Sequence, residues 1–218
     1  MTFRGLYKFL RDLQKNNSKQ WMDANRDRYE EVRDWYIQWL DNMSLELAKI
    51  DPQYTPTSGK KAINRINNNL MFHPEKPVYK DHFGAGLDQL TKMGDFYIHL
   101  GTSESFIAGG YYHPKPKLLK SIREGIDFNG EKLKEILNRP SFQKMFGGLM
   151  EFDDKLITSP KGYDKNHQHI DLLRNKSFAV QCDLTQEQVL STDFDSRVIE
   201  IYQEMLPFRR YMNKLTTV

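Results

Sequence analysis

The sequence predicts an α+β fold, with a central, mainly antiparallel sheet covered by helices from both termini, in a single α+β domain spanning residues 1–218. Apolar residues recur at helical spacing near both ends of the chain, whereas apolar and polar residues alternate in short segments of the middle. The connections between these segments, such as "GTSE", are short enough for hairpins. They favour antiparallel pairing over crossovers.

The N-terminal helices follow from the spacing of apolar side chains. We expect an amphipathic helix from Phe3 to Leu13, a break at "KNNS", and a Ser18 cap for the next helix. From about Arg26 to Ile50, apolar residues recur every three or four positions, which predicts a long helix. Its tryptophans could stack on nucleic-acid bases, but an aromatic stripe at helical spacing is typical of a core. We interpret this helix as a core element.

The middle and the C-terminal third supply the sheet and its remaining helices. After the loop "DPQYTPTSGK", strands are expected within "KAINRI", "VYKDHFGAGL", "GDFYIHLG", "SFIAGGYYH" and "KSFAVQCDL", from Ile63 to Cys182. Helices are expected at "PKPKLLKSIREGI", at "NGEKLKEIL" and at "PSFQKMF". The last run, "STDFDSRVIEIYQEMLPFRRYMNKL", predicts an amphipathic helix that Pro207 should kink or divide.

Composition narrows the class of protein. The single cysteine, Cys182, fits a reducing compartment and a small core residue, and no segment approaches the length of a membrane span. We therefore expect a soluble, cytoplasmic protein without a membrane partner. The 32 Lys and Arg residues against 29 Asp and Glu are mixed along the chain, which argues against a nucleic-acid partner. The oligomeric state stays open.

Alternation within the predicted strands indicates where a functional site lies. One face of the segment 79–87 carries Lys80, His82, Gly84 and Gly86, and the next strand sends Tyr97 and His99 away from its apolar side chains. This face is basic, and its glycines leave room for a ligand. The alternative is the ordinary polar outer face of a one-sided sheet. Both interpretations remain open.

Several segments, taken in order, resemble the bacterial and fungal family known as domain of unknown function 2461. They are "FLRDLQKNNSKQWMDANRDRYE", "RINNNLMFHPEKPVYKDHFGA", "YIHLGTSESFIAGGYYHPKP", "FGGL" and "KGYDKN" followed by "IDLLRNKSF". The resemblance covers nearly the whole chain, and it implies a single α+β domain and supplies no reaction. Carried over by position, its pattern matches Arg65, Phe72, Lys76, Pro77, Tyr79, Lys80, His82, Phe83, Gly84, Arg174, Lys176, Ser177 and Phe178.

The chain departs from this pattern at one place. The family commonly has Arg-Asp followed by a basic residue and Phe, where "NNLMF" places Asn68, Asn69 and Met71. If the family's acid serves as a base or metal ligand, this chain has either lost the activity or binds a different ligand. Asn69 still accepts hydrogen bonds, but it carries no charge.

The functional hypothesis is a basic face that binds an anionic small molecule. The ligand-binding candidates are Arg65, Lys76, Tyr79, Lys80, His99, Arg174 and Lys176, and the catalytic candidate is His82. Because His82 titrates near neutral pH, we expect ligand affinity to fall as the pH rises through the histidine range. No phosphate-binding loop and no complete set of metal ligands is recognised, so we expect no cofactor and no metal.

Two other accounts of the same residues stay open. The protein could be a non-catalytic module whose exposed face or helices bind a partner protein, and for this reason the sequence does not decide whether it is an enzyme. The cations could also serve the fold alone, by pairing with carboxylates elsewhere in the chain.

Overall fold

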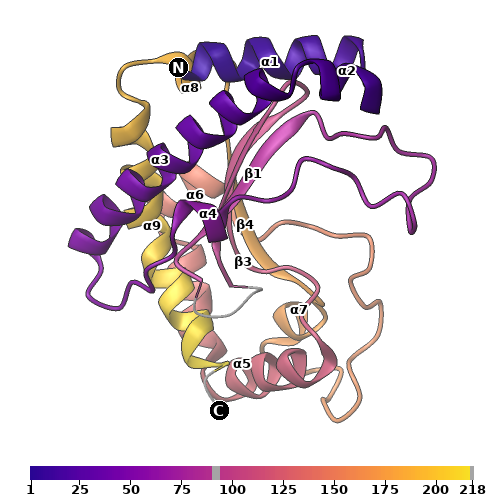
Figure 1. Cartoon of the computed structure of the whole chain (residues 1–218). Helices are drawn as coiled ribbons and strands as arrows, with labels where there is room; N and C mark the ends of the chain where they lie inside the picture. The colour runs from indigo at the N-terminus through magenta and orange to yellow at the C-terminus, as the bar shows by residue number, and fades with distance from the viewer. Residues whose placement is uncertain (90–93, 217–218) are drawn as a thin grey trace. The chain divides into compact units, whose positions relative to one another are not determined.

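The structure, a computed structural model, describes residues 1–89 and 94–216. The elements in chain order are α1 (Phe3–Lys15), α2 (Lys19–Ala24), α3 (Arg26–Ile50), α4 (Gly59–Ala62), β1 (His82–Leu87), β2 (Phe96–Gly101), β3 (Ser105–Tyr111), α5 (Pro116–Leu137), α6 (Pro140–Phe146), α7 (Ile170–Leu173), β4 (Phe178–Asp183), α8 (Gln186–Leu190) and α9 (Phe194–Lys214) (Figure 1). The four strands form one antiparallel sheet in the order β1-β2-β3-β4, packed with helices from both ends of the chain. The predicted α+β class is confirmed.

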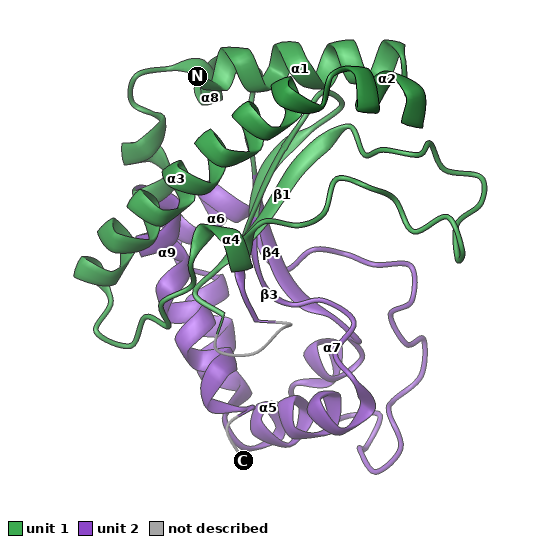
Figure 2. Cartoon of the chain, in the orientation of Figure 1, with its two compact units in different colours: residues 1–89, 97–107, 183–199 green, residues 90–96, 108–182, 200–218 purple. Residues whose placement is uncertain are grey.

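The chain divides into two compact units that are interleaved in sequence (Figure 2). Unit 1 holds residues 1–89, 97–107 and 183–199, and unit 2 holds residues 90–96, 108–182 and 200–218. The sequence predicts a single domain for residues 1–218. The division into two units does not decide this, so the single domain stays a prediction.

The core of unit 1 is built from aromatic side chains on α1, α3 and β1. Phe83 of β1 lies within 6.5 Å, between ring centroids, of Phe9, Tyr29 and Tyr36. Trp39 is 9% exposed and stacks on Tyr36, so the aromatic stripe of the long helix belongs to the core, as predicted. Ser18 accepts a hydrogen bond from the Trp21 amide and caps α2, also as predicted.

Unit 2 is organised around α5 and α9. The non-helical backbone of Asn129 (φ −146°, ψ 45°) interrupts α5 near the junction of the two helices predicted there. The helix α9 contains Pro207 and is not divided by it. Met205, Leu206 and Phe208 are buried beside the proline, and this tertiary packing outweighs the lost backbone hydrogen bond. Cys182 is buried in β4, which confirms it as a core residue.

The first predicted strand is wrong. The segment "KAINRI" begins within the short helix α4 and then forms only isolated bridges, from Ile63 to Ala85 and from Asn67 to Tyr79. Pro74 and Pro77 lack the N–H groups that a continuous ladder needs, so the intervening chain forms an exposed loop. The two bridges also differ in register, because four positions separate Ile63 from Asn67 but six separate Tyr79 from Ala85, and regular pairing starts at His82.

Among the residues that the structure describes, no helix is both long and apolar enough to cross a membrane.

Candidate functional site

The candidate site lies in unit 1, on the face of β1 and β2 that points away from the aromatic core. Alternation is confirmed in β1, where Phe83 belongs to the core and His82 contacts His99 of β2 instead. Tyr97 and His99 share this second face, because their rings meet each other and the ring of Phe106 from β3. We call His82, Tyr97, His99 and Phe106, together with the residues that surround them, the sheet-face site.

Three rings form a stack at the centre of the site. The His99 ring lies between His82, at 3.8 Å between centroids, and Phe106, at 4.5 Å. The Tyr97 hydroxyl lies 3.5 Å from Nδ1 of His99. His99 is only 7% exposed, so its imidazole is held in a largely apolar sandwich.

Two glycines form the floor beneath these rings. A Cβ atom at Gly84 would overlap the Tyr97 hydroxyl, and a Cβ at Gly101 would lie 2.9 Å from Cβ of His82 and 3.1 Å from Nε2 of His99. Gly84, which was predicted to leave room for a ligand, and Gly101, which was not singled out, therefore make room for the rings themselves, because any larger residue would displace them.

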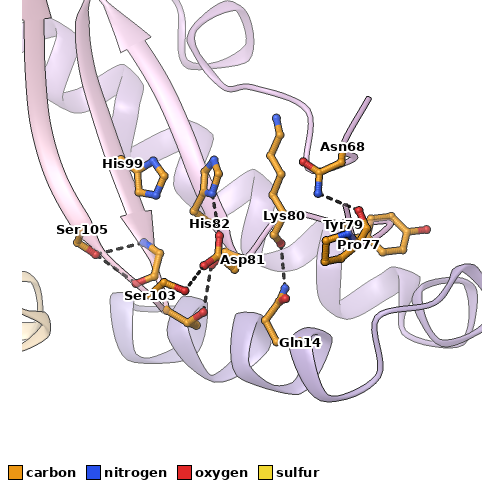
Figure 3. Close-up of polar contacts among 12 residues, drawn as sticks. Gln14, Asn68, Pro77, Tyr79, Lys80, Asp81, His82, His99, Ser103 and Ser105 are labelled. Atoms are coloured by element: carbon orange, nitrogen blue, oxygen red, sulfur yellow. Dashed lines mark hydrogen bonds and ion pairs between the residues drawn. The ribbon is translucent and has the colours of Figure 1, made fainter. Parts of the chain in front are cut away.

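An acid and a hydroxyl orient His82. Nδ1 of His82 lies 3.0 Å from Oδ1 of Asp81, and Ser103 donates its hydroxyl to Oδ2 of the same carboxylate at 2.6 Å (Figure 3). The turn that carries Ser103 is fixed by Ser105, whose Oγ accepts from the Gly101 amide at 3.1 Å. Within the described residues, Nε2 of His82 has no hydrogen-bond partner. The imidazole is thus anchored at one nitrogen and open at the other.

Burial sets the protonation of both histidines. It lowers the pKa of His99 to about 4, and the nearby His82 ring adds to this effect. Burial also lowers the pKa of His82 below 6.5, although the hydrogen bond and charge of Asp81 oppose the shift. Burial would raise the pKa of Asp81, but the hydrogen bonds from Ser103 and His82 lower it. At neutral pH the pair is therefore a neutral imidazole beside an ionised carboxylate.

The structure brings three of the predicted cations together. Lys80 extends to the same side as His82 in Figure 3, and its ammonium donates to the carbonyl oxygen of Arg65 at 2.7 Å. Burial lowers the pKa of Lys80, and the positive charges of Arg65 and Lys76 lower it further. Within the described parts of the chain, none of the three forms an ion pair with a carboxylate.

Tyr79 has a different surrounding. It is 5% exposed, and its backbone N–H and C=O both bond to the side chain of Asn17, each at 2.9 Å. Gln14 of α1 holds the next residue by donating to the Lys80 carbonyl at 3.0 Å. Figure 3 shows the Tyr79 ring pointing away from the Lys80 ammonium. Its predicted role in ligand binding stays a prediction.

Arg174 and Lys176 belong to unit 2, between α7 and β4. Arg174 lies 3.6 Å from Asp171 in an ion pair, whereas Lys176 forms none among the described residues. Their convergence with the cations of unit 1 stays a prediction.

The position at which the chain departs from its family pattern is an exposed loop tip. Met71 is 80% exposed and Phe72 is 69% exposed. Asn68 uses its side-chain amide to donate to the Pro77 carbonyl at 2.9 Å, which closes the loop. Asn69 stands in the same exposed turn.

Sequence reasoning missed Asp81 as the partner of His82, Ser103 as the partner of Asp81, and Phe106 as the third ring. The adjacent letters "DH" were the available signal for the acid. Across residues 1–89 and 94–216, no group of three potential metal ligands is found.

Comparison with known proteins adds a family. The sequence model of the conserved hypothetical protein family DUF2461 matches residues 5–211. No curated protein matches the chain.

Proposed function

Because the chain belongs to the DUF2461 family, whose description as conserved hypothetical proteins names no reaction, we propose a function from the geometry: the sheet-face site binds an anionic small molecule, and His82 exchanges a proton with it. The observation that carries the proposal is the set of unpaired cations, Arg65, Lys76 and Lys80, beside an imidazole with one open nitrogen.

The cations supply the attraction for an anion. None of the three neutralises a carboxylate in the described parts of the chain, so their charges stay available to a ligand. Lys80 and Arg65 are also coupled directly, because the Lys80 ammonium bonds to the Arg65 carbonyl. Three positive charges held close together repel one another, and a bound anion relieves that repulsion.

His82 supplies the proton chemistry. The ionised Asp81 accepts from Nδ1, which fixes the tautomer and leaves the lone pair on Nε2 toward the ligand. Since the pKa of His82 is lowered, the ring is neutral at pH 7 and acts as a general base. The hydrogen bond from Ser103 keeps Asp81 in position while the proton moves.

We expect Lys80→Ala to weaken the binding of anions by about tenfold, and His82→Ala to do so below pH 6.5, where the ring is protonated, since each then removes a charged contact worth about 1.5 kcal/mol. Thermal-shift screening against phosphates, nucleotides and carboxylic acids would identify the best anion, and calorimetric titration would then measure its affinity. Lys8→Ala, an exposed lysine of α1, is the matched control and should leave the affinity unchanged.

Failure of all anions to stabilise the protein, or unchanged affinity in both variants, would contradict the proposal. The second candidate function is a non-catalytic module that binds a partner protein, and the exposed Met71 and Phe72 favour it. Loss of a protein complex in a Met71→Ser, Phe72→Ser double variant, with anion binding intact, would support that alternative.

The pH dependence follows from His82. An anion binds more tightly to the protonated ring, and the lowered pKa places protonation below pH 6.5. Affinity should therefore be nearly constant above pH 6.5 and should rise as the pH falls below it. Titrations across this range should show the rise in the natural protein, and His82→Gln should abolish it. A rise that survives in His82→Gln would assign the titration to another group.

A further inference from the structure

A second candidate site lies in unit 2, at the first turns of α5. A pocket of about 230 Å³ opens there between this helix and the loop that carries residues 161–163. Its apolar wall contains Pro116 and Leu119, and its polar side contains Lys120, Arg123, Lys161 and Tyr163. No carboxylate lines it. Pockets that bind drug-sized ligands typically have volumes of about 300–1,000 Å³. This pocket is smaller, so it suits a small ligand.

Arg123 is a rigidly placed cation in this pocket. Its Nε donates to the Leu173 carbonyl at 2.9 Å, and Nη2 donates to the Asn175 carbonyl at 3.1 Å. These bonds fix the plane of the guanidinium but do not neutralise its charge, and Arg123 forms no ion pair within residues 1–89 and 94–216. Burial lowers its pKa, but an arginine stays protonated at neutral pH. A half-buried, preorganised and unpaired positive charge thus faces the pocket.

The remaining donors are also available. The Lys161 ammonium and the Tyr163 hydroxyl make no hydrogen bond or ion pair with any described residue. Lys120 lies 3.6 Å from Glu124, and both side chains are largely exposed, so this pairing is weak. A half-buried, fixed arginine therefore faces the pocket together with two flexible lysines and a phenol.

We propose that this pocket binds the dianionic phosphate group of a small phosphate monoester. Three cationic side chains match a dianion better than the single charge of a carboxylate, and four donors suit the several oxygens of a phosphate. The apolar wall of Pro116 and Leu119 then covers the organic part of the ester. This inference does not rest on the function proposed for the sheet-face site.

Calorimetric titration of the full chain at low ionic strength tests the inference, with phenyl phosphate, inorganic phosphate and acetate as probes. We expect saturable binding of phenyl phosphate, weaker binding of inorganic phosphate, and acetate affinity at least about tenfold lower than that of phenyl phosphate. Lys161→Gln and Tyr163→Phe should each weaken phenyl phosphate binding by about fivefold, roughly 1 kcal/mol. Lys165→Gln, an exposed lysine of the same loop outside the pocket, is the matched control and should change nothing.

Several outcomes would overturn the assignment. Absence of saturable binding excludes the site, and binding that is unaffected by both Lys161→Gln and Tyr163→Phe places the ligand elsewhere. If acetate binds as tightly as phenyl phosphate, the pocket has no preference for phosphate. If inorganic phosphate binds as tightly as phenyl phosphate, the pocket does not contact the organic part of the ester. Titrations repeated in a Lys80→Ala background, in which the sheet-face site is weakened, should show the same losses for Lys161→Gln and Tyr163→Phe, so failure here and failure of the proposed function are distinguishable. The Lys161 side chain bonds to no described residue, and Tyr163→Phe keeps the ring that packs against His167, so these variants should fold.

Discussion

Acidification from about pH 7 to about pH 4 should lower the free energy of unfolding by about 3 kcal/mol through His99 alone. In the unfolded chain His99 takes up its proton near pH 6.5, whereas in the folded protein it does so only at about 4. Between these values the unfolded state binds more protons. The contribution is therefore fully present above pH 6.5, and it is lost as the pH falls toward about 4.

Urea denaturation at a series of pH values measures this effect. Carboxylates and His82 also titrate in this range, so the natural protein must be compared with His99→Gln, in which the dependence between pH 6.5 and about 4 should be shallower by the His99 contribution. His73→Gln is the matched control, because the side chain of His73 is 52% exposed in the loop and stacks on no other ring among the described residues. Parallel pH profiles for the natural protein and His99→Gln would show that the ring stack does not exclude the proton.

Replacing Gly110 with alanine should lower the free energy of unfolding by about 3 kcal/mol. Gly110 of β3 has φ +112°, a backbone conformation that L side chains rarely adopt. Its added Cβ would overlap the carbonyl oxygen of Phe178 and lie 2.9 Å from Cε1 of Phe208. The variant is both strained in its backbone and overpacked against β4 and α9.

Gly148→Ala separates these two causes. Gly148 has φ +111°, nearly the same as Gly110, but the nearest atom to its added Cβ is Nε2 of Gln143, at 3.5 Å. We expect Gly148→Ala to cost only the backbone term, about 1 kcal/mol. Urea denaturation of both variants gives the difference directly, and equal costs would mean that β4 yields to the added methyl group.

Local patterns predicted those parts of the fold that depend on the neighbours in sequence. The spacing of apolar residues in α3 and the alternation around Phe83 each reflect which side of an element is buried, and that information is present in the sequence itself. The strand predicted at Lys61 failed because the register changes between the two bridges: four positions separate Ile63 from Asn67, but six separate Tyr79 from Ala85, so no continuous ladder forms.

Of the site, the sequence predicted the placement of the two histidines but not the residues that orient them. Alternation placed His82 and His99 on one face, and the structure stacks their rings. Asp81 precedes β1, so strand alternation does not govern its direction, and its partner Ser103 lies 22 positions away in the β2–β3 turn. The lowered histidine pKa values depend on how deeply the rings are buried, which the register of three strands decides and the sequence does not display.

The loop between Asn67 and Tyr79 has a consequence for where another domain could be inserted into the chain. Its base is secured by main-chain bonds from Asn68 to Val78, 3.0 Å, and from Lys80 to Ile66, 2.8 Å, and the side chain of Asn17, between α1 and α2, bonds to the backbone of Tyr79. Beyond this base, its main-chain bonds connect only residues of the loop itself. A reporter domain inserted at the tip would leave both ends of the interrupted chain tethered to unit 1, so this loop suits such an insertion.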